Sequence, residues 1–574
     1  MKKVMKNFFM LSIFIVAMSC ANESAESTVQ TDLIFGGDIV TMEGDDLAYA
    51  EAVVFAGDEI LFVGSESQAL KKFPESNAID LKGKTLMPGF VEPHLHPSLA
   101  AIMLKNEIIA PYDWVLPSGT KKGVSTPDEY IERITTSIQE NAVKNEIYFI
   151  WGYHQLWHGE LNRSILNEIA GDQPVGIIHR SFHEIFLNDA AIEVLKLEEK
   201  DFENNPQVEW DRGHFFEGGW LALVPKMAPI LLQPEKYLAG LSIMSDILLQ
   251  NGITTIAEPG FPSSDFDGEL SLLKIEMAKN PPHDVYLIPS GTQLYGMKGG
   301  NKEALAFIET LDTVKDYNTQ NIKFLPKQVK LFSDGAIYSQ LMQMKDGYTD
   351  GHQGEWMTPL DLFQEQISMY WDEGYKIHVH SNGDLGQQQV LDFLKEDQKR
   401  NPREDHRFTL HHMGYFTESM AEQMADLEVE ASVNPYYLWA LADKYSDNGL
   451  GKERAENLVA LKLLTDQSIP VSFHSDFSMA PVEPLTLAWT AINRVSSQGS
   501  AFSQDQRITV YQAMKAITID AARCLNLEKA IGSIRQGKTA NFTLLEENPF
   551  KIDPMKIKDI KVDGVYYNGE LYSN

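Results

Sequence analysis

Cysteine and basic residues are scarce in this chain. Among its 574 residues only Cys20 and Cys524 are cysteines, so a disulfide framework is excluded. Acidic residues outnumber basic ones by 81 to 49, which gives a net charge of -32 at pH 7. This charge opposes the binding of nucleic acid or of an anionic membrane through the protein surface.

The beginning of the chain also lacks an apolar run long enough to span a bilayer. Three lysines precede the apolar run from Phe8 to Met18, which is too short for a transmembrane helix, and Ala17-Met18-Ser19-Cys20 follows it. This pattern resembles a bacterial lipoprotein signal. We therefore expect residues 1–19 to be a signal peptide, Cys20 to carry a lipid at the cell envelope, and residues 20–31 to form a tether. An ordinary secretory signal or an uncleaved anchor is the alternative.

The remaining sequence is that of a large α/β protein. Hydrophobic residues make up 43% of the chain, enough for a large core. Short strands and turns in 32–86 and again in 531–574 predict one small β-sandwich built from both ends. Between them, apolar strands alternate with amphipathic stretches, which predicts a TIM-type (β/α)8 barrel over 87–530 with an insertion at about 97–245. The predicted barrel strands are 86–92, 253–258, 284–290, 328–334, 375–380, 407–412, 429–434 and 470–476.

The strand that ends in His94-Leu95-His96 is the strongest candidate for a functional site. Side chains two residues apart on a strand project from the same face, so His94 and His96 can bind one cation together. Imidazole is the commonest metal ligand in proteins. The alternative is two histidines in a turn before Pro97.

Other polar residues gather where further predicted strands end. Because the carboxyl ends of barrel strands meet at one face, we expect these side chains to converge there. Spacing alone does not choose between His378 and His380, or between His411 and His412. The set consists of Lys330, His378, His380, His411, His412, His474 and Asp476.

Several of these segments together resemble the amidohydrolase superfamily of metal-dependent hydrolases, in particular the branch that includes N-substituted formamide deformylase. The resemblance extends over nearly all of the chain after residue 31. It is carried by the segments Met87 to His96, Gly252 to Thr255, Val329 to Gly335, His380 to Asp384, Gly451 to Ala455, His474 to Asp476, and Gly532 to Lys538.

The resemblance implies a metal centre and names its residues. The implied ligands are His94, His96, Lys330, His380, His412 and Asp476. It implies a divalent cation, zinc above all, in one or two copies, with Lys330 carboxylated if two ions are bound. His183, with Asn188 five residues later, resembles a pocket histidine of the family. Glu217 and Arg494 are weaker matches that equally suit structural charges.

The chain also departs from the family pattern. Ser181-Phe182 precede the pocket histidine where the family has Asp-Gly, and His411 stands where glutamate is common. Residues 336–340 replace a smaller loop that bears arginine, and Asn541 stands in place of aspartate. These departures leave the metal ligands intact and predict a different substrate pocket, for which Trp114, Trp151, Trp157 and Trp220 are candidate lining residues.

The implied activity is hydrolysis of a carbon–nitrogen bond, other than a peptide bond, in a small amide-type molecule. Metal-activated water attacks the carbonyl group, and Asp476 serves as general acid and base. Two alternatives remain open. A related barrel can act as a deaminase or a cyclic-amide hydrolase, and a lipoprotein with altered loops can bind a ligand without turnover.

Overall fold

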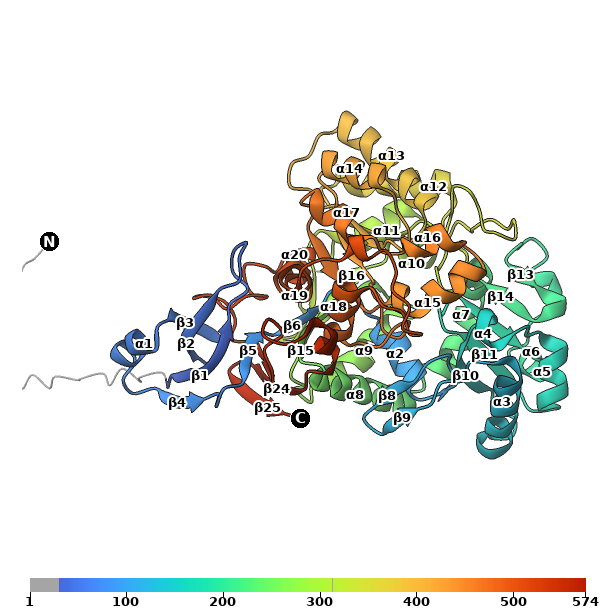
Figure 1. The fold of residues 1–574 in the computed structure, drawn as a ribbon. Coiled ribbons are helices and arrows are strands. Elements are labelled where there is room, and N and C mark those ends of the chain that lie inside the picture. Colours follow the sequence, from blue (N-terminus) through green and yellow to red (C-terminus); the bar gives the residue numbers. More distant parts are fainter. Residues whose placement is uncertain (1–29, 312) are drawn as a thin grey trace, which may run out of the picture.

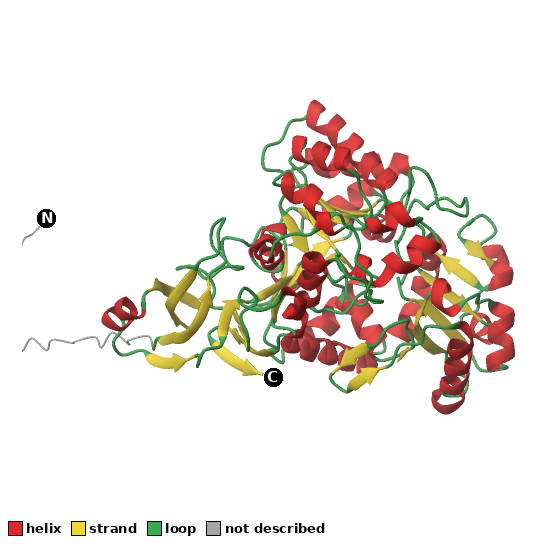
Figure 2. Cartoon of the chain, in the orientation of Figure 1, coloured by secondary structure: helices red, strands yellow, loops and turns green. Residues whose placement is uncertain are grey.

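The computed structural model describes residues 30–311 and 313–574. The expected signal peptide and Cys20 lie outside these residues. Within them, no helix combines the length and the apolar character that crossing a membrane requires. Strands and helices are both abundant, and most of the helices surround the strands of the central part (Figure 2).

Both ends of the described chain contribute to one eight-stranded sheet. Figure 1 shows its first strands in blue beside the last strands in red. The last described strands join the first ones through β23, which runs antiparallel to β5, with Phe542 opposite Pro88. The strands of this terminal sheet are β1 (Asp32–Val40), β2 (Tyr49–Ala56), β3 (Glu59–Gly64), β4 (Asn77–Asp80), β5 (Thr85–Pro88), β23 (Phe542–Leu545), β24 (Val562–Tyr567) and β25 (Glu570–Ser573). One short helix, α1 (Glu66–Lys72), follows β3.

The central part of the chain contains two parallel sheets. The order of the first is β17-β16-β15-β6 and that of the second is β18-β19-β20-β21-β22. A parallel bridge between Ser290 and Lys330 joins them. Their strands are β6 (Phe90–Glu92), β15 (Ile253–Phe261), β16 (Asp284–Pro289), β17 (Ile322–Phe324), β18 (Gln328–Phe332), β19 (Lys376–Ser381), β20 (Thr409–His412), β21 (Glu430–Val433) and β22 (Val471–Phe473).

Backbone hydrogen bonds also connect the segments that follow β22 and β6. The amide of Asp476 donates to the carbonyl of His94 (3.1 Å), and the amide of His96 donates to the carbonyl of Phe477 (2.9 Å). The first and last parallel strands therefore end side by side, which brings residues almost 400 positions apart into contact.

Helices follow the parallel strands along the chain. They are α8 (Pro234–Gln250), α9 (Phe266–Met277), α10 (Gly291–Lys298), α11 (Asn301–Ile308), α12 (Leu360–Asp372), α13 (Asp384–Arg400), α14 (Glu418–Asp426), α15 (Tyr436–Asp447), α16 (Lys452–Glu456), α17 (Leu461–Asp466), α18 (Pro484–Asn493), α19 (Val510–Ala516) and α20 (Ile519–Cys524). Their buried apolar side chains join those of the strands in one large core, except that α20 packs in a smaller cluster with residues of β6, β15 and β16.

The segment predicted as a single strand over 86–92 is two strands. β5 belongs to the terminal sheet and β6 to a parallel sheet, and Gly89 separates them. A Cβ atom on Gly89 would lie 2.1 Å from Oγ1 of Thr254, so only glycine lets the chain pass β15 this closely. Residues 532–538, part of the segment predicted as short strands and turns, form a turn without strand.

The long gap between β6 and β15 holds a mixed sheet with its own helices. The sheet order is β13-β14-β12-β11-β10-β7, and β8 pairs with β9 apart from it. The strands are β7 (Glu107–Ile108), β8 (Trp114–Leu116), β9 (Gly119–Lys121), β10 (Tyr148–Tyr153), β11 (Val175–His179), β12 (Glu184–Leu187), β13 (Val208–Glu209) and β14 (His214–Phe216). The helices are α2 (Pro97–Leu104), α3 (Pro127–Asn141), α4 (Gln155–His158), α5 (Arg163–Ala170), α6 (Asp189–Val194) and α7 (Gly218–Leu231).

Candidate metal centre

His94 and His96 lie just beyond the first parallel strand, not on it. β6 ends at Glu92 because Pro93 has no N–H to continue the ladder. The loop is nevertheless held on both sides, since the amide of Leu95 donates to the carbonyl of Ala257 (3.0 Å) and that of His96 to Phe477. The two imidazoles remain neighbours, with ring centroids 5.1 Å apart. The predicted pair of histidines is therefore present, but backbone hydrogen bonds to neighbouring segments, and not a strand, hold it in place.

Asp476 brings a carboxylate to both of these histidines. Its Oδ1 lies 3.4 Å from Nε2 of His94 and 3.1 Å from Nε2 of His96. The backbone of Asp476 has φ +57°, a left-handed conformation that costs a residue other than glycine about 1 to 3 kcal/mol. The hydrogen bond from its amide to His94 helps to hold this turn.

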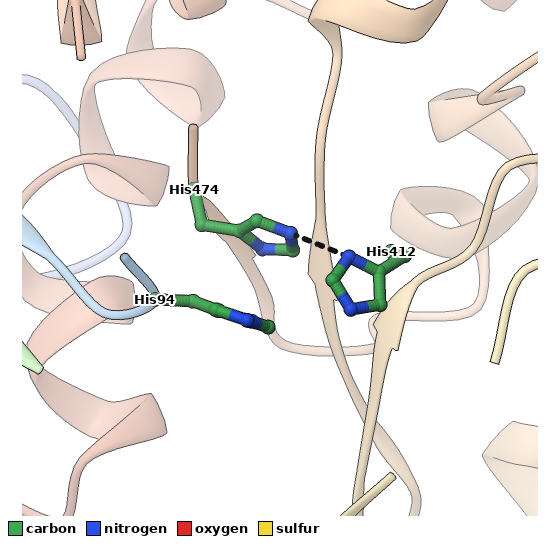
Figure 3. A group of neighbouring side chains, drawn as sticks. All are labelled: His94, His412 and His474. Atoms are coloured by element: carbon green, nitrogen blue, oxygen red, sulfur yellow. Dashed lines mark hydrogen bonds between the residues drawn. The ribbon is translucent and has the colours of Figure 1, made fainter. Parts of the chain in front are cut away.

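His412 and His474 complete a cluster of imidazoles around His94 (Figure 3). Nε2 of His474 lies 3.2 Å from Nδ1 of His412, and the hydroxyl of Tyr437 lies 3.2 Å from the same nitrogen. The other ring nitrogen of His412, Nε2, is buried and has no hydrogen-bond partner among the described residues. His474 was identified in the sequence only as part of a strand end, yet its ring stacks on that of His94.

Lys330 lies in β18, close enough to this cluster for its charge to lower the pKa values of His94 and His474. Its side chain is fully buried, and Nζ has no hydrogen-bond partner within the described part of the chain. Burial lowers its pKa to about 7, although the charge of Asp476 acts in the opposite direction. A lysine in this state offers a neutral amine near neutral pH, which an exposed lysine does not.

His380, itself a metal-ligand candidate, lies beside His412, and His183 lies beside His380. The ring of His380 is 4.2 Å from that of His412 and 5.7 Å from that of His183. Nδ1 of His183 lies 2.8 Å from Oε2 of the buried Glu217. Burial by itself lowers the pKa of His183, but the charge of Glu217 and the hydrogen bond to it outweigh this and raise the pKa.

Two further carboxylates hold this loop, and the sequence analysis missed both. Oε1 of Glu258, at the end of the predicted second strand, lies 2.6 Å from Nδ1 of His96. Oε1 of Glu92 accepts from the amides of His94 (3.3 Å) and Ser475 (3.1 Å) and so connects β6 with the end of β22. The only signal in the sequence was an acidic residue at the end of an apolar strand.

These contacts determine which groups carry protons when no cation is bound. Burial alone lowers the pKa of His96, but the charges of Glu258 and Asp476 and the hydrogen bonds to them raise it to about 10. Burial holds the pKa values of His94, His380, His412 and His474 well below the usual range. Most of the cluster therefore consists of neutral imidazoles, the form that binds metal.

A divalent cation fits this set of donors. Oδ1 of Asp476 is buried without a well-oriented hydrogen-bond donor in the described chain, although two imidazole nitrogens face it. Buried polar atoms are normally satisfied, and imidazole nitrogens with a carboxylate oxygen are typical ligands of zinc and related ions. Two groups that include His94 place their ligand atoms within 4.8 Å of one another, namely His94 with His96 and Asp476, and His94 with His412 and His474. His378, His411 and Cys524 form a third such group.

A cavity of about 140 Å³ opens above this candidate centre. His380 and His412 line it, whereas His378 and His411 do not. Of the four tryptophans predicted to line a pocket, Trp220 does so. Trp114, Trp151 and Trp157 are buried in the core instead. Arg494 lies elsewhere and donates four hydrogen bonds to backbone carbonyls, which is a structural role.

Comparisons with known proteins agree on one family and one fold. A family model described as "Amidohydrolase family" matches residues 77–572. The chain is 26% identical to Protein LONG AFTER FAR-RED 3 of Arabidopsis thaliana over 542 residues, which cover 90% of this chain and 87% of that protein. It is 23% identical to N-substituted formamide deformylase of Arthrobacter pascens over 559 residues, covering 91% and 94%. Among solved structures, an uncharacterized metal-dependent hydrolase from Pyrococcus horikoshii OT3 shares the fold with a TM-score of 0.69 at 20% identity, covering 92% of this chain and 99% of that one.

Proposed function

The chain belongs to the amidohydrolase family, and from this premise we propose that it hydrolyses a carbon–nitrogen bond, other than a peptide bond, in a small amide-type substrate. The observation that carries the proposal is the buried Oδ1 of Asp476, which faces Nε2 of His94 and Nε2 of His96 at the floor of a cavity. An acceptor oxygen opposite two imidazole nitrogens is an arrangement that a divalent cation satisfies.

The proposed ligands are His94, His96, Lys330, His380, His412 and Asp476, and zinc is the proposed metal. His474 is an additional candidate because its ligand atom lies close to those of His94 and His412. If Lys330 is carboxylated, it holds a second ion. A bound divalent cation would polarise the carbonyl group of the substrate and lower the pKa of a water molecule to about 7.

The side chains then have distinct tasks. Asp476 takes the proton of the attacking water as the C–O bond forms, and it delivers this proton to the nitrogen as the C–N bond breaks. Glu217 holds Nδ1 of His183 and leaves its Nε2 available to the substrate. We propose that His183 donates a hydrogen bond to the substrate and thereby orients it in the cavity.

The (β/α)8 barrel and the β-sandwich are also part of this proposal. Of the nine parallel strands, the short β17 lies at the edge of the first sheet beside β16; the other eight, with β22 and β6 linked beyond their ends, support a (β/α)8 barrel. The terminal sheet supports the composite β-sandwich. In a barrel, catalytic residues occupy the carboxyl ends of the strands, and His94, His380, His412 and Asp476 lie at or just beyond those ends. The lipid on Cys20 and the location at the cell envelope are proposed from the sequence pattern alone.

The test combines metal analysis with hydrolysis assays on N-acyl and N-formyl amines. We expect the protein to bind one or two divalent ions per chain and to release amine. Asp476→Ala should abolish turnover and retain most of the metal, whereas Asp505→Asn, at an exposed position, should behave like the wild type. Full activity of Asp476→Ala, or activity that persists without metal, would refute the proposal. Release of ammonia from a ring or opening of a cyclic amide would instead identify a deaminase or a cyclic-amide hydrolase.

A further inference from the structure

The cavity above the candidate centre has two chemically different ends. Its floor carries the imidazoles and the carboxylate described above. Its wall is apolar and comes largely from two helices of the insertion, α7 and α2. The side chains that these helices contribute include Trp220, Leu221, Val224 and Leu231 from α7, and Leu99 and Ile102 from α2.

The residues that line this cavity include no lysine and no arginine. Arg180 lies behind the wall, where its Nη2 donates to the carbonyl of Met479 (3.1 Å). Its guanidinium packs on the ring of Tyr338 at 4.2 Å, and its side chain is only 1% exposed. Its Nε and Nη1 have no hydrogen-bond partner among the described residues, but the side chain does not line the cavity. A substrate carboxylate in the apolar part of the cavity would therefore lose its hydration without gaining a cation, which is strongly unfavourable.

We propose that the substrate is an uncharged amide whose larger substituent is apolar and about as large as one aromatic ring. This inference rests on the proposed hydrolase function, because it places the reacting bond at the histidines. The volume sets the upper limit on this substituent, since an apolar cavity of about 150 Å³ accommodates benzene, and the cavity here, including the space over the histidines, has about 140 Å³. The apolar walls contributed by α7 and α2 would select the substituent.

The test compares two substrates that differ by one carboxylate, formanilide and 4-formamidobenzoate. We expect kcat/KM for formanilide to be at least 100-fold higher. Val224→Lys places a cation on the wall and should reduce this preference at least tenfold, whereas Val224→Leu should preserve it. Binding of benzyl alcohol and of benzoate, followed by tryptophan fluorescence, gives the same comparison without turnover. Because the chain has nine tryptophans, Trp220→Phe identifies the part of the signal that comes from the cavity.

The outcomes separate this inference from the proposed function. If neither amide is hydrolysed but benzyl alcohol binds at least tenfold more tightly than benzoate, the cavity preference stands and the amide chemistry fails. If 4-formamidobenzoate is hydrolysed as well as formanilide, or benzoate binds as tightly as benzyl alcohol, the inference is wrong. Arg180 would then be the cation that the ligand reaches.

A second inference comes from a different set of contacts, a chain of three imidazoles beneath the centre. Nδ1 of His94 lies 2.8 Å from Nδ1 of His411, and Nε2 of His411 lies 2.8 Å from Nδ1 of His378. Nε2 of His378 in turn lies 2.8 Å from Oε1 of Gln328. We call His94, His411 and His378 the imidazole chain. All three rings are buried.

The far end of this chain fixes the direction of every proton in it. Nε2 of Gln328 donates to the carbonyl of Leu525 (3.0 Å), so its Oε1 must be the acceptor that faces His378. His378 therefore carries its proton on Nε2, and its Nδ1 accepts. A contact of 2.8 Å between two ring nitrogens holds one proton.

The same reasoning assigns the protons of the other two rings in the imidazole chain. His411 must carry its proton on Nε2, which leaves its Nδ1 as an acceptor. His94 must then carry its proton on Nδ1. Only Nε2 of His94 is left with a free lone pair, and this is the nitrogen that faces Asp476.

We infer that Gln328, His378 and His411 are positioning residues that lock His94 in the tautomer whose Nε2 binds the cation. This role gives a reason for His411 at the position where related sequences have glutamate. A carboxylate at this position would also accept from Nδ1 of His94. It has no proton to donate to Nδ1 of His378, however, so the proton order set by Gln328 would not extend to His94. Partners of a metal-binding histidine typically change metal affinity 10- to 100-fold when they are removed.

The test uses variants at Gln328, which three imidazole rings separate from the cation. Gln328→Leu removes the acceptor and should weaken Co²⁺ binding about tenfold and alter the visible absorption of the Co²⁺ protein. Gln328→Glu retains the acceptor and should bind Co²⁺ nearly as the wild type does. His406→Gln is the control, because His406 is buried in the same part of the chain but bonds only to backbone groups among the described residues.

Neutron diffraction of the metal-free protein checks the proton order directly. We expect deuterium on Nε2 of His378, Nε2 of His411 and Nδ1 of His94. The opposite order, or equal Co²⁺ affinities of Gln328→Leu and the wild type, would overturn the inference. If Gln328→Leu does not fold, His411→Leu and His411→Gln form an equivalent pair, since glutamine can both accept from His94 and donate to His378.

Discussion

Nδ1 of His96 lies 2.6 Å from Oε1 of Glu258, while the opposite nitrogen of the same ring lies 3.1 Å from Asp476. Glu258 therefore orients His96 from outside the candidate metal centre. A carboxylate that accepts from one nitrogen of an imidazole makes the other nitrogen a better ligand.

The first prediction concerns this carboxylate. Glu258→Leu should weaken zinc binding about 10- to 100-fold, because no acceptor then holds Nδ1 of His96. Glu258→Gln retains an acceptor oxygen and should lose less. Competition with a chelating dye measures both affinities, and unchanged zinc binding by Glu258→Leu would show that Glu258 has no such role.

The second prediction concerns Lys330. Carboxylation joins a neutral amine to carbon dioxide and releases a proton, and the lowered pKa of about 7 favours the neutral amine. Protein prepared with bicarbonate should bind more metal per chain than protein prepared without it. Lys330→Met should bind the same amount under both conditions. Metal quantification is the measurement. If the metal content of the wild-type protein does not change with bicarbonate, Lys330 is not carboxylated.

The third prediction concerns pH and a histidine remote from the metal. Burial lowers the pKa of His158 to about 3, although a hydrogen bond to the carbonyl of Val124 raises it slightly. The unfolded chain binds a proton near pH 6.5 and the folded one does not, so this group costs stability as the pH falls from 6.5 toward 3. The loss should reach about 2 kcal/mol between pH 7.5 and pH 5.

His158→Gln provides the matched comparison for that loss. Glutamine can donate to Val124 and accept from the amide of His154, as His158 does, but it does not titrate. Its free energy of unfolding should therefore fall less between pH 7.5 and pH 5 than that of the wild type. Denaturant unfolding at the two pH values measures the difference, and parallel pH profiles would argue against a buried neutral His158.

The fourth prediction concerns the junction at Gly89. Gly89→Ala places a Cβ against Thr254 and should destabilise the protein by about 1 to 3 kcal/mol. Adding Thr254→Ala removes the atoms nearest to that Cβ and should restore part of the loss. Thermal unfolding of the two variants is the measurement. If the single variant melts like the wild type, the two strands are not in tight contact.

Much of the site was predictable because strand ends converge. His94, His96, His412 and Asp476 stand at or just after apolar strands, and the parallel arrangement brings such ends together. The choice between His411 and His412 could not be made from spacing and came only from the family resemblance. Neighbouring residues of a strand face opposite sides, and which side faces the cavity depends on the register of the neighbouring strands. His411 faces His378, whereas His412 faces the cavity.

Other features depended on packing between distant segments. Glu258 was visible only as a single acidic residue at the end of an apolar strand, and nothing in the sequence joins it to His96. The break between β5 and β6 depends on Gly89 passing close to Thr254, a contact between residues far apart in the chain. The apolar wall formed by α7 could likewise not be predicted from the sequence, because only the folded insertion turns this helix toward the cavity.

The register of β23 against β5 has a mechanical consequence. Phe542 pairs with Pro88, and six residues beyond Pro88 the same backbone delivers His94. Loss of the final 33 residues would leave β5 with β1 as its one remaining neighbour and loosen the support from which His94 is presented. Amino acids at the far carboxyl end of this enzyme would thus influence turnover without approaching the reacting bond.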